Sequence, residues 1–403
     1  MSGVFSRLVG QSEVVAELTA AAHGSRGDSD HPGGTGSMTH AWLFTGPPGS
    51  GRSVAALCFA AALQCTSDGV PGCGHCRACT TTMAGTHGDV RRVIPEGLSI
   101  SVREARDIVL AASKRPTTGR FQIVIIEDAD RLTESAANAL LKVVEEPPPA
   151  TVILLCAPSL DPEDIAITLR SRCRHVALMT PSADAIAGVL MEQDGLGEDD
   201  ARWAASVSGG HVGRARRLAT DPEARDRRAR ALGLARDAAT PSRAYAAVEE
   251  LVKSAESEAD TLTAERNEAE TEELQIALGA GGTGKGTAGS LRGSAGALKA
   301  LEDRQKSRKT RARRDALDRS LIDLATYFRD ALVVAGGAEA VTLSHPDMAE
   351  KVTRLAAHAS ADRLLRCIEA VLACREALAT NVKPKFAVDA MVATIGQALR
   401  SVD

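Results

Sequence analysis

Three near-continuous apolar runs occur in the first half of the chain, each of a length that suits one strand. They cover residues 40–45, 121–126 and 151–156. Helical patterns fill residues 53–63 and 133–146 between these runs, and the second pattern stops at three consecutive prolines. Buried strands that alternate with helices are typical of a parallel sheet covered by helices. The pattern therefore predicts an α/β domain over residues 1–180.

Beyond about residue 180 the strand pattern disappears, and the rest of the chain has helical periodicity. Glycines at 209, 210 and 213 interrupt a short helical region, which predicts a small helical module over residues 181–240. The helical periodicity of residues 241–403 predicts a larger helical domain, which a Gly/Ser-rich stretch at 279–296 interrupts. We find no internal repeat of fixed period, which argues against a repeat architecture.

An insertion around residues 254–314 has opposite charges at its two ends. Residues 256–273 hold eight acids and one base, and residues 304–314 hold seven bases and no acid. A chain that folds back near residue 288 sets 262–272 opposite 304–314. This predicts an antiparallel helical hairpin whose register is fixed by charge. Two alternatives stay open: two separate solvated helices, or a basic arm that contacts DNA phosphates.

A glycine-rich turn follows the first apolar run and precedes a helix. Residues 46–53 read Gly-Pro-Pro-Gly-Ser-Gly-Arg-Ser, which fits the phosphate-loop spacing except that Arg52 stands where lysine is usual. The glycines let backbone N–H groups turn toward a phosphate at the helix N-terminus. Arginine is longer, planar and forked, so it is not a conservative replacement for the lysine. The candidate nucleotide-binding residues of this turn are Gly46, Gly49, Gly51, Arg52 and Ser53.

The second apolar run ends in two acids in an unusual order. Glu127 and Asp128 occupy the place where an aspartate would hold Mg²⁺ and a glutamate would orient the attacking water. Each carboxylate is displaced by about one methylene, and catalysis is sensitive to shifts of that size. Together with Arg52, this order predicts a degenerate ATP site without efficient hydrolysis. It leaves open whether this chain binds ATP and Mg²⁺ at all.

Four of the nine cysteines lie within residues 65–79, in the spacing Cys-x7-Cys-x2-Cys-x2-Cys. Four thiolates complete a tetrahedral Zn²⁺ site and leave no position for a catalytic water, so the spacing predicts a structural zinc module. An iron–sulfur cluster is the alternative, because four cysteines also suit such a cluster. The predicted ligands are Cys65, Cys73, Cys76 and Cys79.

Composition narrows the setting in which the protein works. The 403 residues are 44% hydrophobic and 25% charged, with a formal net charge of −4, which is typical of a globular protein. No run of about 18 uncharged apolar residues occurs, and the first residues lack a signal-peptide pattern. We therefore expect a cytoplasmic protein without membrane contact. The acidic balance and the 2% aromatic content disfavour nucleic acid as the main partner of the whole surface.

Four motifs in this order resemble the bacterial DNA polymerase III clamp-loader family of AAA+ proteins, and in particular its delta-prime (δ′) branch. They are the turn at 46–53, the cysteine module at 65–79, the Leu-Leu-Lys to Glu-Glu-Pro-Pro segment at 138–148, and the Ser-Arg-Cys at 171–173. Residues 327–330 and 381–386 match the family only loosely. The resemblance implies a P-loop AAA+ domain with an inserted zinc module at 1–180, a helical lid at 181–240 and an all-α collar domain at 241–403.

The resemblance also implies a role for the chain. Arg172 matches the family's arginine finger, which reaches into a neighbouring subunit's ATP site and stabilises charge on the γ-phosphate. In the lid, Gly213 stands where the motor subunits carry an arginine. The implied function is to help load the sliding clamp onto primed DNA, with gamma/tau and delta subunits as partners and with ATP hydrolysed by the motor subunits. A surface arginine paired with a carboxylate is the alternative for Arg172.

Three alternative functions stay open at this point. A motor (gamma/tau-like) subunit that tolerates Arg52 would bind and hydrolyse ATP by itself. A non-replicative AAA+ adaptor would share the fold and carry a partner-specific region, for which the insertion is the candidate. Direct nucleic-acid binding through the cysteine module is disfavoured, because Arg77 is the only basic residue between positions 65 and 79.

Overall fold

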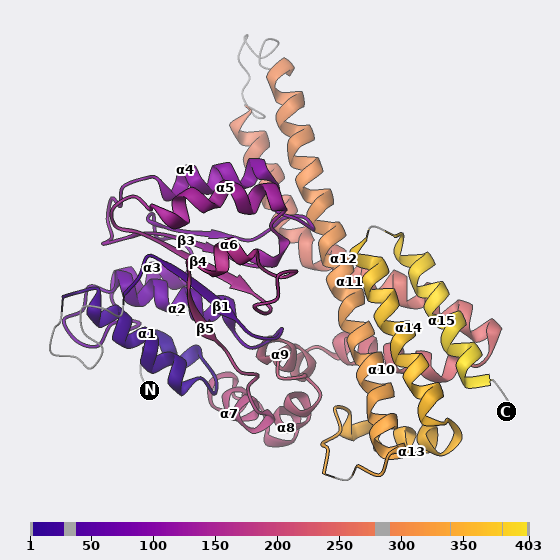
Figure 1. Cartoon of the computed structure of the whole chain (residues 1–403). Coiled ribbons are helices and arrows are strands. Elements are labelled where there is room, and N and C mark those ends of the chain that lie inside the picture. The colour runs from indigo at the N-terminus through magenta and orange to yellow at the C-terminus, as the bar shows by residue number, and fades with distance from the viewer. Residues whose placement is uncertain (1–2, 28–37, 279–290, 339, 381, 401–403) are drawn as a thin grey trace. The chain divides into compact units, whose positions relative to one another are not determined.

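The computed structural model describes residues 3–27, 38–278, 291–338, 340–380 and 382–400 (Figure 1). The chain divides into two compact units, residues 1–216 and 217–403, and each is described by itself below. The boundary falls within helix α9 (Val212–Thr220). The predicted three-part division, with boundaries near residues 180 and 240, stays a prediction. Among the described residues, no helix is both long and apolar enough to cross a membrane.

The first unit contains a five-stranded parallel sheet in the order β2-β3-β4-β1-β5. Its strands are β1 (Ala41–Thr45), β2 (Val90–Val93), β3 (Gln122–Ile126), β4 (Thr151–Ala157) and β5 (Arg174–Ala177). The three central strands are buried at every position, which confirms the three strands predicted from the apolar runs. The edge strands β2 and β5 include exposed positions, so they have no continuous apolar run that would predict them.

Helices cover both faces of this sheet, as Figure 1 shows. Successive strand residues point to opposite faces, so Trp42 and Phe44 pack with Phe59 of α2 (Arg52–Gln64) in one core, whereas Leu43 packs with Leu140 of α5 (Glu134–Glu145) in the other. The predicted α/β domain is therefore confirmed. The other helical segments of the first unit are η1 (Val4–Arg7), α1 (Ser12–Gly24), α2 (Arg52–Gln64), α3 (Arg77–Met83), α4 (Val102–Ala112), η2 (Ala129–Arg131), α5 (Glu134–Glu145), α6 (Ile167–Arg170), α7 (Ala183–Asp194) and α8 (Glu198–Ser206).

Among its described residues, the second unit contains helices and connecting loops but no strand, as the sequence predicts. One apolar core joins its helices, with Leu317 and Phe328 among the fully buried residues. Its elements are α10 (Pro222–Asp237), α11 (Pro241–Ala277), α12 (Leu291–Ala335), η3 (Pro346–Met348), α13 (Ala349–His358), α14 (Ala361–Ala379) and α15 (Pro384–Arg400).

Helices α11 and α12 form the predicted antiparallel hairpin and extend beyond the other helices of this unit (Figure 1). Arg308 donates to both carboxylate oxygens of Glu270, at 2.9 and 3.0 Å, and to the amide oxygen of Asn267 at 2.6 Å. Nearer the core of this unit, Arg313 pairs with Glu256 at 3.0 Å. The paired residues lie on opposite sides of the predicted fold-back point near residue 288, as an antiparallel hairpin requires. The hairpin is therefore confirmed, and the alternative of separate helices is wrong.

The same contacts weaken the proposal that the basic arm binds DNA phosphates. Three bases of this arm, Arg308, Lys309 and Arg313, are each paired with an acid of α11. The carboxylates of those acids already neutralise the positive charges that a DNA phosphate would otherwise neutralise. Residues 279–290, which make up most of the Gly/Ser-rich stretch, lie outside the described residues.

Glu258 anchors the base of the hairpin. This carboxylate is buried, and three arginines of the second unit contact it. Arg227 of α10 lies 3.4 Å from Oε2 and Arg319 of α12 lies 2.8 Å from Oε1, while Arg217 at the end of α9 also pairs with Oε1. Because removing one partner of a buried charge cluster leaves the others uncompensated, this end of the hairpin is fixed to its own unit.

Reversing one charge tests the pairing of the hairpin. We expect Arg308→Glu to loosen residues 262–277, because it sets two carboxylates against each other where a forked pair now lies. Hydrogen exchange of α11 backbone amides should rise, and the double variant Glu270→Arg/Arg308→Glu should restore the slower exchange. Lys306→Glu is the matched control, since Lys306 is exposed. Equal exchange in the single variant and the wild type would contradict the assigned register.

Candidate functional site

The phosphate-loop-like turn lies between β1 and α2, in the strand–turn–helix order that the sequence predicts. Gly46 has φ of 152°, and Gly49 has φ of 91°. A Cβ on Gly46 would lie 2.5 Å from the carbonyl oxygen of Leu178, so the turn has no room for a side chain there. The backbone conformation at this position therefore requires glycine, the residue type that the phosphate-loop spacing places there.

Arg52, the residue that departs from the motif, turns back onto the loop itself. Its Nη1 donates a hydrogen bond to the carbonyl oxygen of Gly46. A lysine in a phosphate loop would place its ammonium on the β- and γ-phosphates. In this chain the cationic side chain is engaged by the backbone of its own loop.

The start of helix α9 lies against the same turn. A Cβ on Gly49 would lie 2.7 Å from both Cα and Cβ of His211, so the backbone around His211 covers the loop at this point. The Nδ1 of His211 accepts a hydrogen bond from the backbone N–H of Arg214 at 3.2 Å, which holds the first turn of α9. Sequence reasoning missed this contact, because Gly49 and His211 are distant in the chain and no local pattern connects them.

The acids at the end of β3 are also engaged by the protein. Glu127 accepts two hydrogen bonds from Arg92 on the neighbouring strand β2, from Nε at 3.0 Å and from Nη2 at 2.6 Å. Asp128 has a left-handed backbone, with φ of 51°, and lies 3.9 Å from Nε of Arg131. Because Arg92 neutralises the Glu127 carboxylate, a magnesium ion would have to compete with it. Arg92 was also missed by sequence reasoning, since an arginine on an exposed edge strand has no distinctive signal.

Ser53, the last residue of the motif, faces a thiol at the end of β4. Burial raises the pKa of Cys156, and the hydrogen bond with the Ser53 side chain acts in the opposite direction. The thiol is therefore neutral at physiological pH. The four motif positions Arg52, Ser53, Glu127 and Asp128 thus lie around one end of the sheet, and each already has a partner within the chain.

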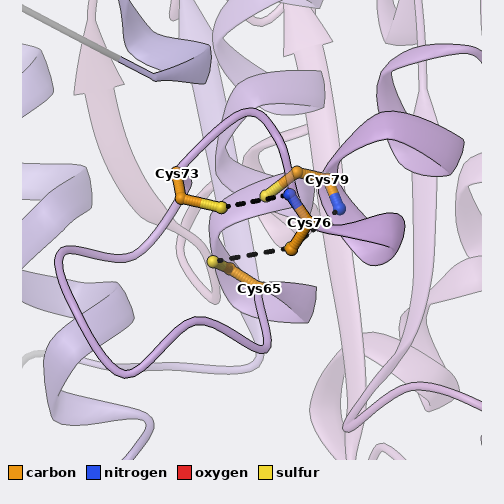
Figure 2. A group of neighbouring side chains, drawn as sticks. All are labelled: Cys65, Cys73, Cys76 and Cys79. Carbon is orange, nitrogen blue, oxygen red and sulfur yellow. Dashed lines mark hydrogen bonds between the residues drawn. The ribbon is translucent and has the colours of Figure 1, made fainter.

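The four predicted metal ligands converge on one point (Figure 2). Cys65 follows α2 directly, Cys73 lies in the loop, and Cys76 and Cys79 belong to the start of α3. Their Sγ atoms all lie within 4.8 Å of one another, and those of Cys65 and Cys76 are 3.9 Å apart. A tetrahedron with Zn–S bonds of about 2.3 Å has S–S edges of roughly 3.8 Å, so the spacing fits this ion.

Backbone N–H groups favour the thiolate forms that a metal needs. The N–H of Cys76 lies 3.3 Å from Sγ of Cys73, and the N–H of Cys79 lies 3.4 Å from Sγ of Cys76. Burial acts to raise the pKa of Cys76, but hydrogen bonds from Cys79 and Thr66 outweigh it and lower this pKa to about 6. The pKa of Cys65 is also lowered, because backbone donors outweigh its burial. Burial and the neighbouring thiols raise the pKa of Cys79 instead, so this thiol would lose its proton to a bound metal.

The cysteine module is fastened to two other segments of the first unit. Arg26 donates to three carbonyl oxygens of the module loop, those of Cys65, Ser67 and Gly69, at 2.8–3.0 Å. The N–H of Val4 donates to the carbonyl oxygen of Gly72 at 2.9 Å. Val4 and Phe5 are buried in the core that also contains Cys65 and Cys79. The module thus connects η1, α1 and the end of α2.

Arg172 follows the short helix α6 at the surface and has three acceptors. Its Nη1 donates to the carbonyl oxygen of Thr168 at 2.7 Å and to the hydroxyl of Ser171 at 3.2 Å, and its Nη2 lies 2.5 Å from Oε1 of Glu145. Its side chain is 38% exposed. The pairing with a carboxylate, which the alternative for this residue predicts, is therefore present in the chain. The guanidinium is nonetheless accessible from solvent.

Two family models match separate regions of the chain. Residues 33–182 match the model described as DNA polymerase III, delta subunit. Residues 312–386 match the model described as DNA polymerase III, delta subunit, C terminal. The first region includes the phosphate-loop-like turn, the cysteine module and Arg172.

Individual relatives agree with these matches. DNA polymerase III subunit delta' is 35% identical over 157 residues in Bacillus subtilis, with coverage of 39% of this chain and 47% of that protein. The Pseudomonas aeruginosa subunit delta' is 38% identical over 156 residues, with coverage of 38% and 47%. The Mycobacterium tuberculosis subunit gamma/tau is 30% identical over 211 residues, with coverage of 51% and 34%. The chain therefore spans about half of the length of these relatives, or less.

A solved structure of a DNA polymerase III gamma subunit-related protein from Thermotoga maritima aligns over 89% of this chain and 94% of its own. Its TM-score is 0.42 at 15% identity, too distant a likeness to carry an argument. By sequence, the chain is similar to bacterial DNA polymerase III subunits, with identities of 35–38% to the delta' subunits and matches to two delta-subunit family models.

Proposed function

We propose that this chain is a clamp-loader subunit of the delta' type. It helps to load the sliding clamp onto primed DNA as a partner of gamma/tau and delta subunits, and it reaches the clamp and the DNA through that complex. Its own ATP site is degenerate, and it supplies an arginine finger to a neighbouring subunit. The observation that carries the proposal is the state of the phosphate loop, whose cation and acid are both engaged within the chain.

The degenerate site is supported by three independent contacts. Arg52 bonds to the carbonyl oxygen of Gly46, Glu127 is held by Arg92, and the backbone at His211 lies over Gly49. A nucleotide would have to displace each of them before its phosphates and magnesium ion could bind. Because phosphoryl transfer depends on positioned charge, each displaced contact lowers both affinity and turnover.

The arginine finger is supported by the position and exposure of Arg172. The residue follows α6 in the Ser-Arg-Cys motif and is 38% exposed, so a neighbouring subunit can approach it. A guanidinium is planar and permanently charged, which suits the charge that develops on a transferring phosphoryl group.

The four cysteines are proposed to hold one structural zinc ion. Cys65, Cys73, Cys76 and Cys79 would supply four thiolates and leave no open coordination position. When bound, the ion contributes folding free energy and no catalysis. The residues around it, Arg26 and Val4, then keep the end of α2 fixed to the rest of the unit.

The proposed domains are an AAA+ domain at 1–180, a lid at 181–240 and a collar at 241–403. Within the collar, α14 and α15 line a groove whose apolar residues include Ala377, Val382 and Met391. Phe386 lies at this groove and is 62% exposed, which is unusual for a large apolar side chain.

One further function stays in contention. The match to gamma/tau subunits at 30% identity supports a motor subunit that hydrolyses ATP itself. The two functions differ in what the isolated chain does with ATP.

We expect the isolated chain to hydrolyse ATP no faster than its Arg52→Ala/Asp128→Ala variant. The Arg52→Lys variant should stay equally inactive, because Arg92 still holds Glu127. Steady-state phosphate release measures this, and co-purification with gamma/tau and delta subunits tests the assembly. A robust turnover that Arg52→Ala abolishes would instead identify a motor subunit. Failure to co-purify with either subunit would contradict the clamp-loader function.

A further inference from the structure

Arg172 is held between its own helix and a carboxylate from a distant part of the first unit. We propose that Glu145 is a positioning residue for Arg172, which fixes the guanidinium in the orientation that reaches a neighbour's γ-phosphate. This inference rests on the proposed function of Arg172 as an arginine finger. It adds Glu145, the last residue of α5, as the residue that orients the arginine finger.

The contacts fix the guanidinium from two directions. Thr168 and Ser171 accept from Nη1 on the α6 side, and Glu145 pairs with Nη2 from the end of α5. With acceptors on both sides, the flat group has little freedom to rotate. An arginine on the surface without such partners would sample many rotamers and would lose that freedom only when it met the phosphate.

Donors of the guanidinium remain for a ligand. A guanidinium carries five N–H groups, and the two hydrogen bonds of Arg172, to Thr168 and Ser171, both come from Nη1. Nη2 forms an ion pair with Glu145 at 2.5 Å, and Nε has no hydrogen-bond acceptor within the described part of the chain. A phosphate can therefore bind to Arg172 while Glu145 stays in place, so the pair is compatible with a finger that is already oriented.

The location of Glu145 explains why it keeps this partner. It is the last residue of α5, and the acid Glu146 follows it. The C-terminal end of a helix carries partial negative charge, so a carboxylate there is unfavourable without a nearby cation. Arg172 supplies that cation. The two side chains therefore stabilise each other in one arrangement, and α5, which packs on the sheet, sets the direction of the arginine.

The experiment measures ATP turnover of the reconstituted loader with clamp and primed DNA. We expect Glu145→Ala to lower kcat about tenfold at the site served by Arg172, since the arginine must then be ordered during the reaction. KM for ATP should change little, because Glu145 does not touch the nucleotide. Glu145→Gln, which keeps a hydrogen-bond acceptor, should lose less. Glu146→Gln is the matched control, because Glu146 is an exposed neighbour on the same chain segment.

The double variant Glu145→Ala/Arg172→Ala decides whether the two residues act together. We expect it to be no slower than Arg172→Ala alone, because a positioning residue has no effect once its partner is absent. A further loss in the double variant, unchanged or faster turnover of Glu145→Ala, or an equal loss in Glu146→Gln would overturn the inference. Wild-type turnover of Arg172→Ala would instead reject the finger itself. Size-exclusion chromatography of each loader confirms that assembly is intact.

Discussion

Arg172→Ala is expected to abolish ATP turnover at one site of the assembled loader while the chain still folds and assembles. Arginine fingers as a class contribute about 10³- to 10⁵-fold in rate, because they stabilise charge that appears only in the transition state. In the proposed complex the other ATP sites do not depend on Arg172, so bulk turnover should fall only in part. Single-turnover measurement with sub-stoichiometric ATP would separate the affected site as a slow phase.

Arg170→Ala is the matched control for this substitution. Arg170 is the last residue of α6, two positions before Arg172, and is exposed, but its Nη1 donates to the carbonyl oxygen of Leu160 and not to Glu145. Wild-type turnover is expected for this variant. A loader with Arg172→Ala that turns over ATP like the wild type in both phases would rule out the finger.

Removal of the metal is expected to loosen the first unit around η1 and the end of α2. Structural zinc contributes on the order of 10 kcal/mol in isolated zinc-finger peptides, and a part of that in a domain with its own core. The wild-type protein should contain one equivalent of zinc by elemental analysis. Chelation or Cys76→Ser should raise hydrogen exchange at Val4, whose N–H bonds to Gly72 in the module loop.

The Cys76→Ser variant also provides the control for chelation. A chelator should have no further effect on Cys76→Ser, because the site has already lost its ion. Exchange in α12 of the second unit should stay unchanged in every case. Stoichiometric iron would assign a cluster to the four cysteines, and absence of any metal would leave them as free thiols.

The fold was predictable where the sequence pattern is local. Central strands buried on both faces give continuous apolar runs, and the hairpin gives two blocks of opposite charge. The edge strands β2 and β5 were missed, because a strand with one open edge mixes exposed and buried residues. Periodicity alone cannot distinguish such a strand from an irregular segment.

The candidate site was predictable only as a set of motif residues. The turn at 46–53 lies between a strand and a helix, and the four cysteines gather at one point, as the spacing in each motif indicates. The nucleotide and the metal ion that these two sites would bind stay predictions. The partners that decide their chemistry were not predictable. Arg92 and Glu145 are ordinary surface residues in the sequence, and they contact Glu127 and Arg172 only because the sheet and α5 bring them there.

The regular pairing of α11 with α12 also decides how the length of the hairpin could change. Its base is fixed by the buried carboxylate of Glu258, whereas the arms beyond it are joined by charge pairs that range from mostly buried, as in Arg308–Glu270, to exposed, as in Lys309–Asp260. Seven residues added to each arm would extend its reach by about 10.5 Å and return every pair to the same face. The distance to which this chain presents the far end of the hairpin can therefore change in whole-heptad steps while the helical core that carries it stays the same.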